Sequence, residues 1–341
     1  MWLGLALNYK ATDILMSEAH PPRLRIDGDV VAMNNASPLP MEGVVKDLIS
    51  RLSPEQQAIS NELLSNKMDV DCSFDHSSGA RIRANIYRTV DGRAIALRVI
   101  PAKRLTAKEI GLPDSVMKMC NARSGLFIVT GPNGSGKTTT LTAMLDVINE
   151  TRPVHIVTIE DPIEYILHNK RAWISQRELR THIADFRSAV RSVVRENPNV
   201  IVLGEIRDPD STRTALDLAE TGHLVLATMH TRDSISTVER LIGQFDSAMQ
   251  PQVRVMLSEN LLGVLAQLLI PKKGGGLVAS FEVMLSSSSV RNMIREQKLG
   301  QMASVLQTSQ KRGMISMEES LKLLEKRGLI NSAEEHIWRD F

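Results

Sequence analysis

The sequence has few of the residues that define several classes of protein. Only two of its 341 residues are cysteine, so a four-thiolate zinc site is excluded. We expect Cys72 and Cys120 to be small core residues in a reducing cytosol rather than a disulfide. Aromatic residues make up 4% of the chain, and no basic patch is interleaved with them. Stacking platforms for single-stranded nucleic acid are therefore scarce, and no nucleic-acid partner is expected.

Long apolar runs are also missing. The opening residues, MWLGLALNYK, lack a basic segment and have only a short apolar run, so we expect no targeting signal. The longest later run, LLGVLAQLLI (261–270), is too short to span a bilayer. If the protein works at a membrane, we expect it to act there as a peripheral component.

The bulk composition is that of an ordinary globular protein. Apolar residues make up 43% of the chain and charged residues 23%, and the net charge of +2 favours no particular partner. The length predicts about two domains of roughly 150 residues each.

The first part of the chain, residues 1–100, mixes strand and helix signals and predicts an α+β domain. Hairpin turns are indicated at Asp27-Gly28-Asp29 and at Asp91-Gly92, each between apolar runs. Residues 41–53 have helical spacing of apolar residues. Pro101 opens a stretch of mixed charge that predicts a linker over residues 101–113.

The pattern then changes to short apolar strands that alternate with helices, which predicts a parallel sheet over residues 114–275. The strands are expected at GLFIVT, HIVTIE, VIVLGE and HLVLATM. Three glycines (274–276) separate this core from residues 276–341, which we expect to form a helical C-terminal region.

A glycine-rich stretch, GPNGSGKT (131–138), matches the phosphate-binding pattern G-x-x-x-x-G-K-[ST] between a predicted strand and a predicted helix. Inward backbone N–H groups and the helix N-terminus would bind phosphate oxygens. Lys137 would reach the β- and γ-phosphates, and the Thr138 hydroxyl would ligate Mg²⁺. We therefore expect ATP and Mg²⁺. The predicted nucleotide-binding residues are Gly131, Pro132, Asn133, Gly134, Ser135, Gly136, Lys137, Thr138 and Thr139.

The carboxylates expected beside such a nucleotide are not in their usual place. A buried strand such as VIVL (200–203) ordinarily ends in an Asp that helps to hold Mg²⁺. Here Gly204 and Glu205 follow it. Mg²⁺ keeps several waters, so Thr138, phosphate oxygens and water can still complete its shell.

Other carboxylates are expected at a second strand end. TIEDPIE (158–164) brings Glu160, Asp161 and Glu164 to the end of the strand HIVTIE, where α/β sheets bind ligands. These side chains are placed to orient or deprotonate an attacking water.

Taken in order, GPNGSGKTTT, TIEDPIE, VIVLGEIRD and ETGHLVLATMHT are similar to the motifs of the secretion-superfamily ATPases of type IV pili, type II secretion and type IV secretion. The resemblance covers nearly the whole chain. It implies an α/β fold with a small α+β (PAS-like) N-terminal domain, a RecA-like P-loop ATPase core and a helical C-terminal region. It also implies an intact ATPase, because that family's Walker B motif has Gly before its Glu.

The resemblance assigns roles to single residues. Glu205 corresponds to the Walker B glutamate, and Glu164, the last Glu of the family's Asp box, corresponds to the general base. A surface acid that caps a helix is the alternative for Glu164. Two histidines stand at the ends of one predicted strand and correspond to the His box. His230 is placed to sense the γ-phosphate, whereas His223 is expected to pack or to touch another subunit.

The arginines leave more alternatives open. In the resembling family, N-terminal-domain arginines complete the nucleotide site, and the patterns RAN and RVIP favour Arg83 and Arg98 over Arg81 as arginine fingers. A solvated strand face is the alternative. A second row lies on one predicted helix face and favours either a subunit contact or, preferably, solvation. Its members are Arg187, Arg191 and Arg195.

One C-terminal motif indicates which branch of this family the chain resembles. SVRNMIRE (289–296) resembles AIRNLIRE of the pilus-retraction ATPases and keeps its polar residues. Neither the long N-terminal extension nor the four-cysteine zinc motif common in assembly ATPases is expected here. The proposed coupling residues are Arg291, Asn292, Arg295 and Glu296.

The sequence thus predicts a homo-hexameric, Mg²⁺-dependent ATPase that powers type IV pilus retraction and twitching motility. We expect it in the cytoplasm, peripheral at the inner membrane, with a pilus base component as its partner. The alternatives are an assembly, secretion or conjugation motor, a nucleic-acid translocase, and a nucleotide-binding regulator without turnover. Salt-sensitive stimulation of ATP hydrolysis by DNA would favour the translocase.

Overall fold

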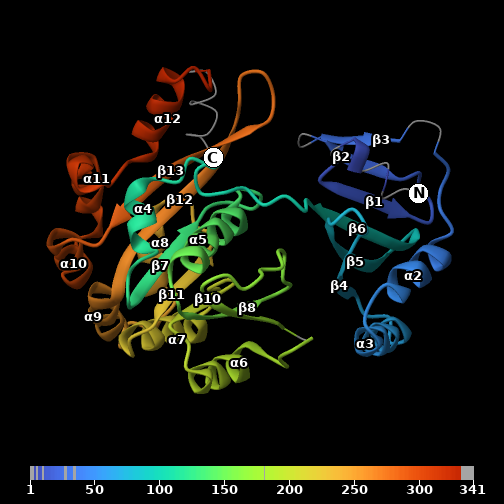
Figure 1. The fold of residues 1–341 in the computed structure, drawn as a ribbon, viewed down its shortest axis with the longest axis horizontal. Helices are drawn as coiled ribbons and strands as arrows, with labels where there is room; N and C mark the ends of the chain where they lie inside the picture. The colour runs from blue at the N-terminus through green and yellow to red at the C-terminus, as the bar shows by residue number, and fades with distance from the viewer. Residues whose placement is uncertain are drawn as a thin grey trace. The chain divides into compact units, whose positions relative to one another are not determined.

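The computed structural model describes residues 4, 7–9, 11–26, 29–33, 36–179 and 181–331. The chain divides into two compact units, Met1–Arg104 and Leu105–Phe341 (Figure 1).

The first unit is built on a six-stranded antiparallel sheet of order β3-β2-β1-β6-β5-β4. Strands such as β5 alternate buried side chains with more exposed ones, and the buried set packs with helix α2, as in Ile82 and Leu48. This confirms the α+β fold expected for the first part of the chain. The elements are β1 (Asp13–Ser17), β2 (Arg23–Ile26), β3 (Asp29–Ala32), α2 (Met41–Ser50), α3 (Pro54–Ser65), β4 (Val70–Asp75), β5 (Arg81–Thr89) and β6 (Gly92–Ile100).

Two local signals explain these elements. The turn between β5 and β6 consists of Val90 and Asp91, one residue earlier than predicted. Gly92, the first residue of β6, has a φ of 108°, which favours glycine. Strands β2 and β3 pair as an antiparallel hairpin, although Asp27 and Gly28 of the predicted turn lie outside the described residues. Helix α3 was not predicted, because Ser60 is its only buried residue and it has no apolar stripe.

The second unit is built on a seven-stranded sheet of order β13-β12-β7-β11-β10-β8-β9. All neighbouring strands are parallel except β13, which runs antiparallel to β12. The strands are β7 (Gly125–Thr130), β8 (His155–Glu160), β9 (Trp173–Glu178), β10 (Val200–Leu203), β11 (Leu224–Met229), β12 (Leu261–Pro271) and β13 (Leu277–Leu285). The helices are α4 (Asp114–Met119), α5 (Lys137–Thr151), α6 (Phe186–Val193), α7 (Pro209–Glu220), α8 (Ser234–Gly243), α9 (Gln250–Asn260), α10 (Ser288–Arg295), α11 (Met302–Thr308) and α12 (Met317–Lys326), with 3-10 turns η1 (Val194–Glu196), η2 (Leu299–Gln301) and η3 (Gln310–Arg312).

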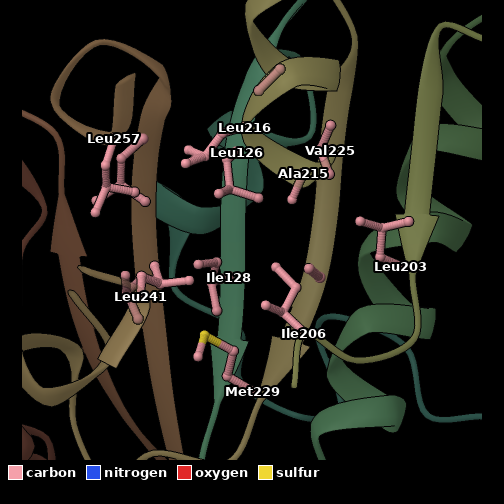
Figure 2. Close-up of a cluster of buried hydrophobic side chains, with 14 of the residues drawn as sticks. Leu126, Ile128, Leu203, Ile206, Ala215, Leu216, Val225, Met229, Leu241 and Leu257 are labelled. Atoms are coloured by element: carbon pink, nitrogen blue, oxygen red, sulfur yellow. The ribbon is translucent and has the colours of Figure 1, made fainter. Parts of the chain in front are cut away.

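Helices cover both faces of this sheet. Leu126 and Ile128 of β7 pack on one side with α7, α8 and α9, as Figure 2 shows for Leu216, Leu241 and Leu257. The alternate β7 residues pack on the other side against α4 and α5. The strands of a sheet that is buried on both faces are nearly continuous apolar runs in the sequence. Four strands of this sheet were therefore predicted correctly. The fold is the RecA-like P-loop core that was expected.

The predicted boundaries need two corrections. Residues 276–341 were expected to be helical, but Leu277–Leu285 forms strand β13. The three glycines, all with positive φ, form the tip of the β12–β13 hairpin rather than a separator. The linker predicted at 101–113 is shorter, because Ala107 and Leu112 are buried in the core of the second unit.

Both cysteines are buried and form no disulfide, as predicted, and they lie in different units. Burial raises the pKa of the Cys120 thiol to about 12, so this thiol is unreactive. Among the helices of the described residues, none is both long and apolar enough to cross a membrane.

Candidate nucleotide site

The glycine-rich loop lies between β7 and α5, where its backbone conformation requires glycine. Gly131, Gly134 and Gly136 have φ values of 146°, 78° and 84°, a region that L side chains rarely adopt. A Cβ at Gly131 would also lie 2.4 Å from the backbone oxygen of Gln267.

The loop fits a phosphate-bearing ligand. Helix α5 begins directly after Gly136, and no side chain caps its first N–H groups, which leaves these donors for an anion. Ser135 Oγ is buried and has no hydrogen-bond partner in the described part of the chain. An unpaired buried hydroxyl is costly unless a ligand or water completes its bonds.

Lys137 lies at the centre of this loop. Its ammonium donates to the carbonyl oxygens of Gly131 and Pro132, both at 2.9 Å, and lies 3.4 Å from His230 Nδ1. Burial lowers the pKa of Lys137, and the carboxylates of Glu205 and Glu164 oppose that shift. The structure therefore brings together the predicted lysine, Glu205 and the predicted sensor histidine, and Glu164 lies near enough to act on the pKa of the lysine.

Gln267 of β12 hydrogen-bonds the phosphate loop and the start of α5, and this role was not predicted from the sequence. Its Nε2 donates to the Ser135 carbonyl and its Oε1 accepts from the Thr140 hydroxyl, both at 2.6 Å. The side chain is 2% exposed. The sequence did contain a signal for this role, a single glutamine within the apolar run LLGVLAQLLI. A glutamine that is buried in such a strand needs hydrogen-bond partners for its amide.

Gly204 is explained by how closely two strand ends approach. A Cβ there would lie 3.1 Å from the Ile159 carbonyl oxygen and 3.4 Å from Glu160 Cα, both backbone atoms at the end of β8. The Gly204 N–H also donates to the Ile159 carbonyl at 2.8 Å. An Asp at position 204 would displace the segment that carries the other carboxylates.

Glu205 is held by two partners. Its Oε2 lies 2.6 Å from Arg207 and its Oε1 lies 3.3 Å from His230 Nε2. Burial lowers the pKa of His230 below its ordinary value, with Lys137 adding to the effect, so the imidazole is neutral at neutral pH. The hydrogen bond to Glu205 raises the pKa of Arg207. Arg207 was also missed, although its place two residues after Glu205 was visible in the sequence.

The loop after β8, which carries the Asp-box residues, is clamped by β9. Gln176 donates to the Tyr165 carbonyl at 2.9 Å and accepts from the Leu167 N–H at 2.7 Å. Glu178, which is buried, accepts from the Ile163 N–H at 2.9 Å. These bonds fix the backbone on both sides of Glu164.

The three Asp-box carboxylates have different surroundings. Burial raises the pKa of Glu160, whose carboxylate accepts from Thr158 at 2.6 Å and Gln176 at 3.1 Å. Asp161 helps to raise the pKa of Arg207. Glu164 lies in a loop and not at a helix start, so the helix-capping alternative is wrong.

His223 is not part of this site. It directly precedes β11, whereas His230 directly follows this strand, so the two histidines lie at opposite ends of β11. The Nδ1 atom of His223 lies 3.0 Å from the Leu218 carbonyl oxygen. There it lines a polar pocket of about 470 Å³ together with Arg123 and Arg152. Its expected packing or subunit role stays a prediction.

The candidate arginine fingers belong to the first unit. Arg83 and Arg98 are cross-strand neighbours on β5 and β6, and Arg98 lies 3.1 Å from Asp13. Arg81 instead bonds Asp75 at 3.0 Å and Ser73 at 2.8 Å. Their roles at a nucleotide stay predictions.

The arginine row of the second unit is not one regular helix face. Helix α6 ends at Val193 and Arg195 lies in the 3-10 turn η1, so the prediction of one helix face is wrong for Arg195. Arg187 pairs with Asp210 at 2.8 Å, and both side chains are exposed. Arg191 and Arg195 are exposed as well, which favours solvation.

The motif at 289–296 forms helix α10 and its end. Val290 and Ile294 are buried in the core, and the proposed coupling residues face solvent. Arg291 donates to Ser286 at 3.0 Å, and Arg295 lies 3.4 Å from Ser258 Oγ. Glu296 accepts from Lys298 at 2.6 Å, which lowers its pKa. Asn292 is exposed on the same short helix.

A metal site made by side chains alone is absent from the described residues, where no group of three or more His, Cys, Asp or Glu residues could hold an ion. Mg²⁺ in nucleotide sites is bound largely by phosphate oxygens and water, and the hydroxyl ligand from Thr138 stays a prediction.

Comparison with known proteins gives consistent matches along the whole chain. Residues 3–337 match the family described as type II/IV secretion system protein. The chain is 40% identical to the type IV pilus retractation ATPase PilT of Pseudomonas aeruginosa, covering 96% of this chain and 94% of that one. It is 43% identical to a twitching motility protein of Neisseria gonorrhoeae, covering 91% and 82%. A crystal structure of the pilus retraction motor PilT with bound ADP is similar, with a TM-score of 0.85, 39% identity and coverage of 98% and 94%.

Proposed function

This chain belongs to the type II/IV secretion system protein family, and from that premise we propose that it is a hexameric, Mg²⁺-dependent ATPase that powers type IV pilus retraction. The observation that carries the proposal is the meeting of Lys137, Glu205 and His230 at one edge of the sheet. Relatives that match this chain nearly from end to end include a pilus retraction motor.

The residues of the site divide the work of ATP hydrolysis. Lys137 and the N–H groups at the start of α5 bind the phosphates. Glu164, on a clamped loop, accepts a proton from the attacking water, and Glu205 orients that water together with the neutral His230. When bound, Mg²⁺ neutralises charge on the phosphates, and Thr138 is its protein ligand.

The proposed motor is a ring in the cytoplasm, peripheral at the inner membrane. In it Arg83 and Arg98 act as arginine fingers, supported by their side-by-side position on β5 and β6. Nucleotide-driven movement of the subunits then acts on a membrane-bound pilus base component.

Helix α10 is the proposed contact that transmits this movement. Its buried residues anchor it, while Asn292 and Arg295 are exposed, and Arg295 hydrogen-bonds Ser258. Replacing both by Ala is expected to leave ATP binding and ring size intact and to abolish retraction. Ser289→Ala, at an exposed position on the same helix outside the proposed coupling residues, is the matched control and is expected to leave retraction intact. Normal retraction in the double variant would mean that this helix face is merely solvated.

Deletion of the gene separates retraction from assembly. Without a retraction motor, cells are expected to carry more pili and to lose twitching motility. Without an assembly or secretion motor, they would carry none, and that result would refute the proposal. Complementation with the wild-type gene and with Lys137→Ala shows whether the phenotype depends on the nucleotide site.

A further inference from the structure

Thr228 of β11 contacts both peptide groups that flank Glu205, and the hydrolysis scheme does not use it. Its hydroxyl donates to the Gly204 carbonyl, which belongs to the peptide group before Glu205. Its own carbonyl oxygen accepts from the Ile206 N–H at 2.9 Å, and this N–H belongs to the peptide group after Glu205. One residue of the neighbouring strand therefore holds the backbone on both sides of the glutamate.

The hydroxyl bond lies where the pairing of the two strands stops. Strand β10 ends at Leu203, whose partner in the register with β11 is Ala227. The Gly204 carbonyl lies one residue beyond this ladder, and the Thr228 hydroxyl donates to it in place of a strand neighbour. Thr228 is 6% exposed, so its hydroxyl is satisfied by this bond rather than by bulk water.

Other contacts fix the chain just before and just after this point. The side chains of Leu203 and Ile206 are buried in the core cluster that Figure 2 shows. The Gly204 N–H donates to the Ile159 carbonyl at 2.8 Å. The peptide group between Gly204 and Glu205 lies between these fixed points.

The direction of the Glu205 side chain depends on this peptide group. The backbone at Glu205 has two soft angles, φ and ψ, and the peptide groups on either side set them. Without the hydroxyl bond the first group would turn more freely, because Gly204 has no Cβ to restrict its own ψ. Two residues after Thr228, His230 Nε2 lies 3.3 Å from Glu205 Oε1. One segment of chain therefore contacts both the backbone and the side chain of the glutamate.

We propose that Thr228 is a positioning residue for ATP hydrolysis, which acts through Glu205 by fixing the peptide groups on both sides of it. The inference rests on the proposed function in taking Glu205 to orient the attacking water. Misplacing a reacting group by about 1 Å costs about a hundredfold in rate. Loss of the hydroxyl is therefore expected to lower kcat by about ten- to a hundredfold. ATP affinity should stay unchanged, because Lys137 and the loop before α5 bind the phosphates in the proposed scheme.

The experiment measures steady-state phosphate release by the full-length protein with ATP and Mg²⁺, together with titration of a non-hydrolysable ATP analogue. Thr228→Val keeps the branched shape and removes the donor, so a lower kcat and wild-type affinity for the analogue are expected. Thr228→Ser keeps the hydroxyl and is expected to retain most of the wild-type kcat.

The matched control is Ser320→Ala in α12. It removes another buried hydroxyl, which accepts from the Phe281 N–H at 3.0 Å. Denaturant unfolding is expected to show a loss of stability in both Ser320→Ala and Thr228→Val. Only Thr228→Val is expected to lose kcat, and this separates positioning from a general effect of lost stability.

The inference is wrong if folded Thr228→Val hydrolyses ATP at the wild-type rate, or if it loses affinity for the analogue. It is also wrong if Thr228→Ser is as slow as Thr228→Val, or if Ser320→Ala is equally slow. If Thr228→Val does not fold, Thr228→Cys supplies only a weak donor and is expected to have a reduced kcat, so a wild-type kcat there would overturn the inference. A wild-type protein without turnover would refute the proposed ATPase and this inference together, whereas a deletion strain without pili would refute retraction alone.

Discussion

Replacing Gln267 by Leu tests whether the phosphate loop is held from β12. The substitution keeps the approximate volume and removes both hydrogen bonds of the amide. The Thr140 hydroxyl and the Ser135 carbonyl, both in buried residues, then lose their partner. Leaving one buried polar group unpaired costs about 1–3 kcal/mol, so the two together predict a loss of about 2–6 kcal/mol in the free energy of unfolding.

The melting temperature gives the same prediction in another form. In a unit of this size, a loss of 1 kcal/mol lowers the melting temperature by about 2–4 °C, so the expected decrease is at least about 4 °C. ATP affinity should fall too, because the Ser135 backbone is no longer fixed. Gln252→Leu, at an exposed position on α9, is the control and should change neither quantity appreciably.

A double-mutant cycle isolates the contact with Thr140. Adding Thr140→Val removes the stranded hydroxyl, so the double variant should be more stable than the sum of the two single effects predicts, by about 1–3 kcal/mol. Denaturant unfolding of the four proteins measures this coupling. Strictly additive effects, or a Gln267→Leu protein as stable as wild-type, would refute the reasoning.

Three further predictions concern the carboxylates and the close strand ends. Glu205→Gln and Glu164→Gln should each keep ATP binding, measured by titration, and lose phosphate release; normal turnover in Glu164→Gln would make that residue structural. Gly204→Ala should reduce stability by about 1–3 kcal/mol and slow hydrolysis, because its methyl group meets the Ile159 carbonyl, whereas Gly243→Ala, with open space around it, should not. Burial raises the pKa of Glu282 above 4.5, so its stability contribution relative to Glu282→Gln is fully present below pH 4.5 and lost as pH rises through the folded pKa; a difference between the two proteins that does not vary with pH would contradict this.

The parts of the fold that were predicted have local signals. Strands β7, β8, β10 and β11 are continuous apolar runs because the sheet is buried on both faces. The phosphate loop was recognisable because its glycines serve backbone conformations that other residues avoid. In contrast, β9 carries the polar residues Gln176 and Glu178, which bond to backbone groups of the loop after β8. Its sequence therefore lacks the apolar pattern that indicates a strand.

The parts of the site that were missed depend on contacts distant in sequence. Gln267 and Ser135 lie far apart along the chain, and only the pairing of β12 with β7 places them together. The role of Gly204 likewise depends on the register between β10 and β8. Strand β13 was mistaken for part of a helical region because its glycine hairpin tip resembles a linker.

The central claim is that this site turns over ATP although Gly204 replaces the usual carboxylate. The most direct test is steady-state phosphate release by the purified full-length protein with ATP and Mg²⁺, compared with folded Lys137→Ala. The account predicts sustained release by the wild-type protein and none by the variant, because Lys137 supplies the charge that neutralises the β- and γ-phosphates. Near-normal release by folded Lys137→Ala, or nucleotide binding without turnover in the wild-type protein, would contradict it.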